Sequence, residues 1–157
     1  DYYPKDSDDS KRWRALLGGN QAGGTVTTCV PYDKAEAAYK EMRRTFKERF
    51  DGRYRNWIHA HFSHWYKSGA MFYARWHIRD VPEDEDILDV YDEAFSTLVP
   101  VALKYEGVVD HHHGIGRMLA RFMSRQDKGG HMVLRKIKKA LDPNNIMNPG
   151  VLGLGGY

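Results

Sequence analysis

Three consecutive histidines stand beside two glycines and an arginine in the segment "VVDHHHGIGR", residues 108–117. The ordinary pKa of histidine lets this side chain accept or release a proton near neutral pH, and its cation attracts anions. Gly114 and Gly116 have no side chain, so another group can approach the backbone closely there. The segment therefore predicts a site that handles a proton and an anion, and a loop of solvated histidines is the alternative.

A second group of histidines, in "HAHFSH" at 59–64, has the spacing of two metal ligands on one strand face. Hydrolytic zinc sites with this pattern also place an acidic residue close behind. Here Phe62, Ser63 and Trp65 surround His64 instead. The sequence thus favours structural or hydrogen-bonding roles for these histidines, and we expect no bound metal.

Hydrophobic patterns predict the elements that carry these residues. Short β-branched and aromatic runs predict strands, and apolar residues repeating every three or four positions predict helices. The order is βαββαβ, then helices, which indicates an α+β, ferredoxin-like domain with a four-stranded antiparallel sheet and both long helices on one face. The expected elements are a short helix at 13–17, a flexible loop at 18–24, strands at 25–30, 55–66, 69–78 and 107–111, long helices at 31–52 and 82–107, and short helices after 117 that are broken at 128–130.

The long helices carry recognisable end signals. Asp33 and Glu36 form a capping-box pattern at the start of the first helix, and Gly52 supplies its end. Pro100 is expected to kink or divide the second helix, because proline has no N–H to donate. Pro143 is expected to prevent the last helix from continuing past it.

One face of the predicted sheet has an unusual composition. Strand side chains alternate between faces, so one set lies under the helices: Ile58, Ala60, Phe62, Phe72, Ala74, Trp76 and Ile78. The opposite face is predicted to hold Trp57, His59, His61, Ser63, Trp65, Met71, Tyr73, Arg75 and His77. Aromatic, Met, Arg and His side chains together favour a face covered by another domain, a partner or a ligand. A partly exposed amphipathic face is the alternative.

Composition sets outer limits on the kind of protein. The chain has 157 residues, 41% of them hydrophobic, which is enough for one core of ordinary size. It begins with aspartate and has no apolar leader, so we expect a piece of a longer polypeptide. Its apolar runs are too short to cross a bilayer. The lone Cys29 excludes an internal disulfide and favours a reducing, cytoplasmic location.

Basic residues are concentrated near the C-terminus of a chain whose net charge is only +3. From Arg117 to Lys139 there are eight Lys or Arg and one acid, Asp127. A solvated helix face explains such a run, and attraction of phosphate or another anionic substrate is the second explanation. Nucleic acid is not an expected partner, because no nucleic-acid-binding motif accompanies the charge.

Four motifs in order carry a resemblance to a known family: "TTCVPYDKA", "SHWYKSGAMFYARW", "HHHGIGR" and "LDPNNIMNPG". With this spacing, the chain from about Thr25 to Gly150 resembles the C-terminal domain of FAD-linked oxidases of the vanillyl-alcohol oxidase superfamily. Within that superfamily it is most similar to the alkyldihydroxyacetonephosphate synthases of ether-lipid synthesis. The implied organisation is a polar segment with a glycine-rich loop at 1–24, the substrate-covering domain at 25–150 and a tail at 151–157.

The resemblance implies a cofactor, partners and site residues. FAD is held mainly by an N-terminal domain outside this chain, and this domain covers the flavin and shapes the cavity for a small substrate, such as a phosphate-bearing lipid precursor. Tyr66 then accepts and donates a proton, beside the active-site histidines His111, His112 and His113. Cofactor contacts are expected from His113, Gly114 and Asn148, and substrate contacts from Arg14, His61, Arg75 and Arg117.

The related 2-hydroxyacid dehydrogenases carry H-x-G-D-G-N-L-H on the corresponding hairpin and EHGIG in place of HHHGIG. This chain has neither GDGN nor that glutamate, which argues against metal-assisted hydroxyacid oxidation. An FAD-dependent alcohol or 2-hydroxyacid oxidoreductase remains the second hypothesis, and a non-catalytic interaction domain is the third. A homodimer is left open, and the fragment alone is expected to be inactive.

Overall fold

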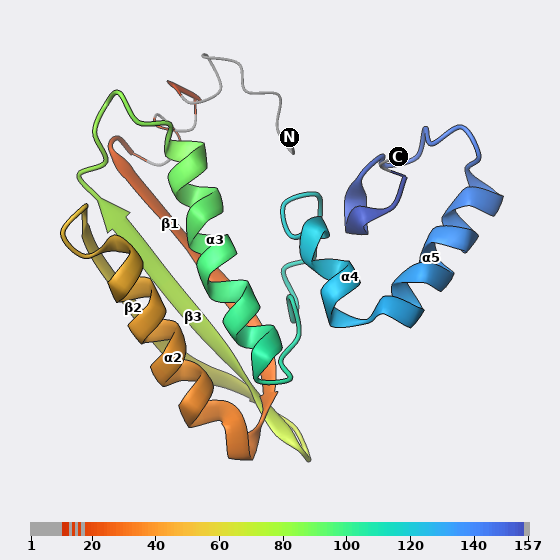
Figure 1. Ribbon diagram of the computed structural model, residues 1–157, viewed down its shortest axis with the longest axis horizontal. Helices are drawn as coiled ribbons and strands as arrows, with labels where there is room; N and C mark the ends of the chain where they lie inside the picture. The colour runs from red at the N-terminus through yellow and green to blue at the C-terminus, as the bar shows by residue number, and fades with distance from the viewer. Residues whose placement is uncertain (1–10, 13, 15, 17, 156–157) are drawn as a thin grey trace.

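The computed structural model describes residues 11, 12, 14, 16 and 18–155, so the helix expected at 13–17 lies largely outside the described residues. Three antiparallel strands form the sheet in the order β1-β3-β2: β1 Gln21–Pro31, β2 Arg55–Trp65 and β3 Gly69–Arg79. The long helices α2 (Tyr32–Phe50) and α3 (Ile87–Lys104) lie side by side on one face (Figure 1). The predicted α+β class with both helices on one face is therefore confirmed.

The remaining elements follow α3 and lie to one side of the sheet (Figure 1). They are the 3-10 turn η1 Ala120–Phe122, α4 Met123–Gln126, α5 Lys128–Leu141 and the 3-10 turn η2 Val151–Gly153. None of the described helices is long and apolar enough to cross a membrane.

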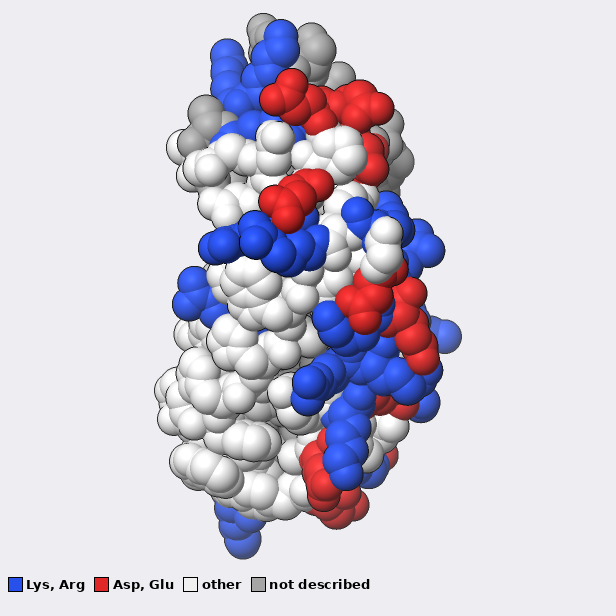
Figure 2. Space-filling model, turned by 90° about the vertical axis from the view of Figure 1, so that its left-hand side faces the viewer, with Lys and Arg blue, Asp and Glu red and all other residues white. Residues whose placement is uncertain are grey.

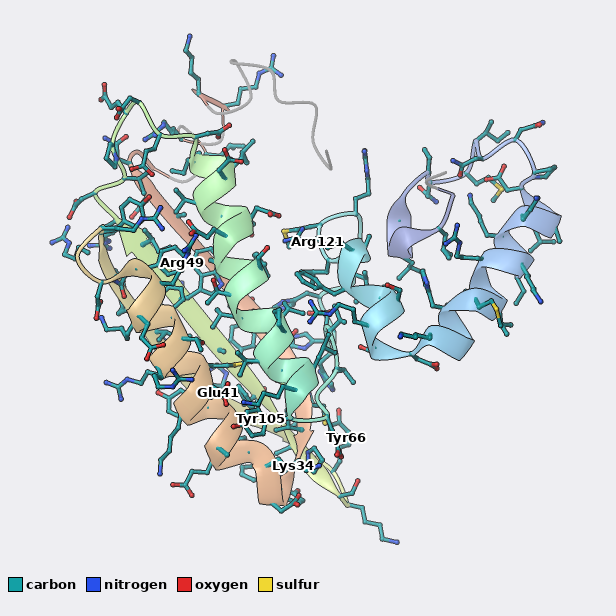
Figure 3. The ribbon with its side chains drawn as sticks, viewed as in Figure 1. Lys34, Glu41, Arg49, Tyr66, Tyr105 and Arg121 are labelled. Carbon is teal, nitrogen blue, oxygen red and sulfur yellow. The ribbon has the colours of Figure 1, made fainter. Side chains whose placement is uncertain are left out.

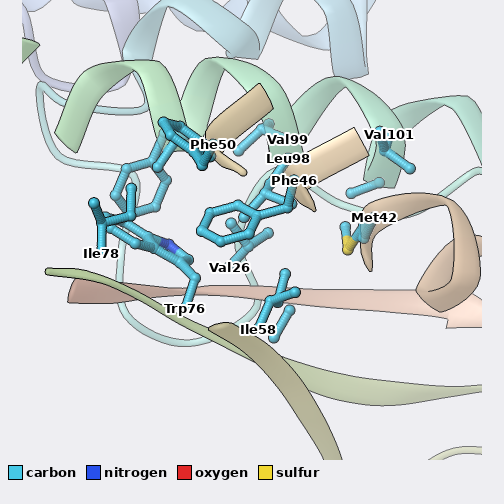
Figure 4. Close-up of a cluster of buried hydrophobic side chains, with 14 of the residues drawn as sticks. Val26, Met42, Phe46, Phe50, Ile58, Trp76, Ile78, Leu98, Val99 and Val101 are labelled. Carbon is cyan, nitrogen blue, oxygen red and sulfur yellow. The ribbon is translucent and has the colours of Figure 1, made fainter. Parts of the chain in front are cut away.

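The core lies between the sheet and the two long helices (Figure 4). The indole of Trp76 on β3 is fully buried and contacts Phe46 of α2 and Phe95 of α3. From β2, Ile58 joins this layer, whereas Phe62 stays 43% exposed near the hairpin end. The predicted layer under the helices is thus confirmed except at its outer end.

Strand β1 begins earlier than the sequence indicates. Residues 18–24 were expected to form a loop, but Gly23 and Gly24 pair with His77 and Trp76 of β3. A Cβ at Gly24 would lie only 2.8 Å from the indole of Trp76. The glycine therefore serves close packing rather than flexibility, because the largest core side chain lies against the backbone.

The fourth predicted strand does not form in the described part of the chain. Residues 107–111 have no ladder partner and cross the edge of β1 instead. Thr28, on the helix side of β1, donates its hydroxyl to Val108 O at 2.8 Å. Gln126 Oε1 accepts from the N–H of Val109 at 2.6 Å. Side chains thus satisfy backbone groups that a strand would have paired.

A β-bulge in β2 corrects the predicted faces of the hairpin end. Phe62 pairs with Phe72 but His64 pairs with Met71, so Ser63 is the extra residue. The shift brings His64 onto the face away from the helices. Trp65, predicted on that face, stacks instead on the ring of Tyr32 at the start of α2, with centroids 6.2 Å apart.

The helix ends also differ from their sequence signals. Asp33 is not the cap of α2, because the helix begins at Tyr32 directly after β1 and places Asp33 in the first turn. Pro100 does not divide α3, which runs on through a heavily buried segment on both sides of the proline. The break expected at 128–130 lies at Asp127, whose carboxylate accepts from Gly130 N and caps α5.

Helix α5 has few contacts with the rest of the described chain. His131 is its single buried residue, and His131 Nε2 is 3.0 Å from Leu152 O in η2. An apolar face remains exposed, formed by Val133, Leu134, Ile137 and Leu141. The helix ends at Leu141, before Pro143, as predicted.

Asp142 anchors the C-terminal turn after α5. Its carboxylate bonds to Lys138 and accepts the N–H groups of Ile146 and Met147, both at 2.9 Å. The bond from Lys138 and these backbone donors lower the pKa of Asp142 from 3.8 to about 2. Only the ionised carboxylate can accept all of these hydrogen bonds.

Replacing Asp142 by Asn should make stability less dependent on acid pH. Because the folded-state pKa lies below the ordinary value, the carboxylate stabilises the fold above pH 3.8 and this contribution is lost as pH falls towards 2. We expect the full-length Asp142→Asn protein to melt several degrees below wild type at pH 7, with a gap that narrows below pH 4. Thermal melts of both proteins between pH 2 and pH 7 measure this difference in melting temperature. A difference that stays constant across these pH values would contradict the stabilising role of the ionised carboxylate.

Candidate functional site

Tyr66 lies at the end of the β2–β3 hairpin, close to the loop that follows α3 (Figure 3). Its N–H donates to Gly69 O at 2.9 Å, and its carbonyl accepts from the hydroxyl of Tyr32 at 2.6 Å. A side chain at Gly69 would collide with the carbonyl of Val30, so glycine lets the hairpin close against β1. The backbone of Tyr66 is therefore held by hydrogen bonds, while the residue as a whole is 46% exposed.

The three histidines reach the open face of the sheet, the face away from the helices, because their loop crosses the edge of β1. Asp110 holds this loop by accepting from the hydroxyl of Thr27 and from the N–H of Gly114, the latter at 2.7 Å. Gly114 has a φ of 89°, in the region that favours glycine. One carboxylate thus fastens both ends of the histidine run to the open face.

Tyr66 and two histidines form a continuous hydrogen-bonded series. Tyr66 Oη is 2.7 Å from His111 Nε2, and His111 Nδ1 is 3.0 Å from His112 Nδ1. When the phenol donates to Nε2, a neutral His111 carries its proton on Nδ1 and donates to His112. The arrangement can pass a proton between a substrate atom at Tyr66 and the imidazoles.

The surroundings of His111 favour its neutral form. Desolvation lowers the pKa of His111, and the nearby His112 and His64 lower it further, while Asp110 acts in the opposite direction. The ring of His64 lies 5.1 Å from that of His111. A neutral imidazole beside Tyr66 is a ready proton acceptor near neutral pH.

The third histidine continues the cluster along the sheet. His113 Nδ1 lies 3.3 Å from Thr25 Oγ1, and the ring of Tyr73 meets that of His113 edge-on at 5.4 Å. The ring of His61 stacks on that of Tyr73, with the two centroids 5.0 Å apart. Arg75 is the cross-strand partner of Thr25. The structure therefore brings His61 and Arg75 to the same face as the histidine cluster.

Three other predicted site residues lie elsewhere. Arg14 donates to Pro82 O and Glu85 O at 2.7 and 2.6 Å, in the loop between β3 and α3. Arg117 and Asn148 lie by the C-terminal turn, where the guanidinium of Arg117 approaches Gly150. No contact among the described residues joins these three to the histidine cluster.

Sequence patterns alone did not place three residues beside His111–His113: Thr27, His64 and Asp110. Asp110 had a signal, since aspartate side chains in turns and loops accept hydrogen bonds from nearby backbone N–H groups. Thr27 had none beyond strand alternation, and His64 reaches the open face only through the bulge.

Replacing Asp110 by Asn should lower activity with little change in the core. The amide keeps the shape but removes the negative charge and provides one acceptor oxygen instead of two, so either Gly114 N–H loses its acceptor or Thr27 must change from donor to acceptor. Misplacing catalytic groups by about 1 Å can cost roughly 10²-fold in rate, and we expect a loss of about 10- to 100-fold in kcat. Turnover of the full-length enzyme measures it, with Asp33→Asn on α2 as the control. Wild-type turnover in Asp110→Asn would contradict the role.

Within the described part of the chain, no three His, Cys, Asp or Glu side chains are grouped as a metal site. The expectation that this domain holds no zinc stays a prediction. Elemental analysis of the purified full-length protein checks it, and one equivalent lost on replacing His59 or His61 would contradict it.

Comparisons with known proteins identify the family of this chain. The family model of FAD linked oxidases, C-terminal domain, matches residues 10–152. An alkyldihydroxyacetonephosphate synthase from Dictyostelium discoideum is 32% identical over 136 residues, covering 85% of this chain and 22% of that protein. One from Trypanosoma brucei brucei is 34% identical over 138 residues, covering 87% and 22%. The chain thus spans about a fifth of the length of these relatives.

A solved structure and a glycolate oxidase subunit are also similar to this chain. A solved structure of alkyldihydroxyacetonephosphate synthase superposes with a TM-score of 0.59 at 26% identity, over 93% of this chain and 24% of that chain. Glycolate oxidase subunit GlcD from Bacillus subtilis is 31% identical over 68 residues, 43% of this chain and 14% of that protein. Since the family model covers nearly all of the sequence, the chain belongs to the FAD-linked oxidases and contains their C-terminal domain.

Proposed function

We propose that this domain closes the substrate site of an FAD-dependent enzyme that transfers an alkyl group onto dihydroxyacetone phosphate in place of an acyl group. The observation that carries the proposal is the hydrogen bond between Tyr66 and His111, in a chain whose matched relatives include two alkyldihydroxyacetonephosphate synthases. The synthase activity belongs to those relatives, and its transfer to this chain rests on the shared motifs.

The proposed role of Tyr66 is to hold and move one proton. In such an exchange a substrate C–H loses a proton early and regains it late, so one group must act first as base and then as acid. The phenol oxygen of Tyr66 meets the substrate, and His111 Nε2 takes the phenol proton when the oxygen must accept another. His112 shares the charge through its bond to His111 Nδ1.

The residues of the open face suit a planar cofactor. Aromatic rings lie in parallel pairs there, Trp57 with His77 at 4.6 Å and His61 with Tyr73 at 5.0 Å. FAD would supply the electron-accepting ring that this domain lacks. By the family resemblance, His113, Gly114 and Asn148 are the residues assigned to hold it, and of these only His113 and Gly114 belong to the loop that reaches the open face.

The remainder of the protein is the proposed cover for this face. His59, His61 and Arg75 of the open face are exposed, and so are the apolar residues of α5. Exposed apolar surface such as that of α5 marks interaction sites. An FAD-binding domain outside this sequence would account for both. This supports the proposal that this domain contributes side chains to an active site whose FAD is held mainly by another domain.

The test is anaerobic mixing of the full-length, FAD-loaded protein with acyl-dihydroxyacetone phosphate and a long-chain alcohol. We expect an ether product and released fatty acid in equal amounts, with the flavin spectrum unchanged at the end, because the exchange involves no net oxidation. Bleaching of the flavin by 2-hydroxyacids or aromatic alcohols, with reoxidation in air and no ether product, would reject the synthase.

That second outcome corresponds to the other candidate function, an FAD-dependent alcohol or 2-hydroxyacid oxidoreductase. The similarity to glycolate oxidase subunit GlcD favours it, over a shorter stretch than the synthases match. The same Tyr66–His111 pair would then remove a proton during oxidation. The two candidates differ in whether electrons remain on the flavin, which the mixing experiment measures directly.

A further inference from the structure

A groove of about 450 Å³ lies on the open face between β1 and β3, next to the histidine cluster. Three cross-strand pairs line it in rows: Thr25 with Arg75, Gly23 with His77, and Gln21 with Arg79. The middle row is hollow because Gly23 has no side chain. A Cβ at Gly23 would lie 3.1 Å from Nδ1 of His77, so even alanine would begin to fill the hollow.

Two arginines stand at the ends of this groove. Arg75 donates Nε to His77 Nε2 at 3.0 Å, which leaves both terminal nitrogens of its guanidinium directed elsewhere. Arg79 lies over the ring of Trp57, with Cζ 4.8 Å from the centroid. Neither forms an ion pair with a carboxylate of the described residues, whereas the neighbouring Arg55 pairs with Asp80.

The electrostatic surroundings of the groove are positive. None of the three strands contains Asp or Glu. Figure 2 shows acidic and basic side chains interspersed at the top and along the right-hand side of one face of the molecule, with a largely uncharged area at the lower left. Desolvation together with Arg75, His59 and Arg79 lowers the pKa of His77, so its ring stays a neutral acceptor for Arg75.

We infer that this groove is the subsite for the phosphate group of the substrate, with Arg75 and Arg79 as its hydrogen-bond donors. Guanidinium groups match phosphate oxygens in geometry and charge, and they do so best where no carboxylate competes. The hollow over Gly23 gives the phosphate room between the two arginines, and Trp57 holds Arg79 in place.

The position of the groove links it to the chemistry. Thr25 belongs to both regions, since it pairs with Arg75 across the strands and its hydroxyl contacts His113. A phosphate in the groove would therefore direct the rest of the substrate along the histidines towards Tyr66. This inference rests on the proposed function, because it assigns to the site a substrate that carries phosphate.

The test measures binding rather than turnover. Inorganic phosphate is titrated into the full-length, FAD-loaded protein by calorimetry, for wild type, Arg75→Gln, Arg79→Gln and Gly23→Ala. Arg43→Gln on α2 is the control, since it removes the same charge from an exposed arginine far from the groove. A lost charge-assisted hydrogen bond weakens binding by roughly 10- to 100-fold.

We expect wild type to bind one phosphate per chain. Both arginine variants should bind phosphate at least about 10-fold more weakly, and Gly23→Ala should also bind it more weakly. Arg43→Gln should bind phosphate as wild type does. Unchanged affinity in the arginine variants, no binding by wild type, or stronger binding of acetate than of phosphate would overturn the inference. Loss of FAD from the arginine variants would also overturn it, because the groove would then hold the cofactor. If phosphate binds as expected but acyl-dihydroxyacetone phosphate gives no ether product, the synthase function is rejected and the phosphate subsite is retained.

Discussion

Tyr66→Phe should lower the kcat of the full-length enzyme by about 10²-fold or more, the usual contribution of a positioned acid or base. The substitution removes only the hydroxyl that lies 2.7 Å from His111 Nε2, and the backbone contacts of Tyr66 to Tyr32 and Gly69 remain. Substrate binding should change far less than kcat, because the lost group acts on a proton. Steady-state kinetics measures both parameters.

The control is Tyr39→Phe, which removes a phenol hydroxyl from α2, away from the open face. It should leave kcat unchanged. A Tyr66→Phe enzyme with wild-type kcat would show that the proton goes elsewhere, and His111 would then be the first alternative to test. Loss of rate alone does not separate synthase from oxidoreductase, since both need the proton moved.

Trp76→Ala should destabilise the domain by about 3–5 kcal/mol, the range for truncating a buried aromatic side chain. The indole is fully buried, with its ring 5.3 Å from Tyr91 and 5.6 Å from Phe95 of α3. Its removal leaves a cavity between the sheet and both helices that the backbone at Gly24 cannot fill. Urea unfolding followed by circular dichroism measures the loss.

Trp76→Phe is the matched control. It keeps an aromatic ring in the core, and it removes Nε1, which is buried without a hydrogen-bond partner among the described residues. We therefore expect a clearly smaller loss than for alanine. Equal losses for the two variants would mean that the packing around Trp76 tolerates no smaller ring, and a negligible loss for alanine would contradict the central position of Trp76.

The sequence by itself determined the class of the fold and the family. Periods of two and of about 3.6 residues depend on local chemistry, so they identified the β2–β3 hairpin, both long helices and the buried row that includes Ile58 and Trp76. The motifs around Tyr66 and His111–His113 pointed to FAD-linked oxidases, and the family match confirmed that. These features are local in sequence, and short segments suffice to specify them.

Only the tertiary structure decided how the pieces meet. The segment 107–111 has strand-like composition, but Thr28 and Gln126 satisfy its backbone from distant parts of the chain, and it crosses the edge of β1. The bulge at Ser63 reverses the alternation and brings His64 to the histidines. Long-range side-chain hydrogen bonds and a one-residue shift in register have no periodic signature, because each depends on partners far apart in the sequence.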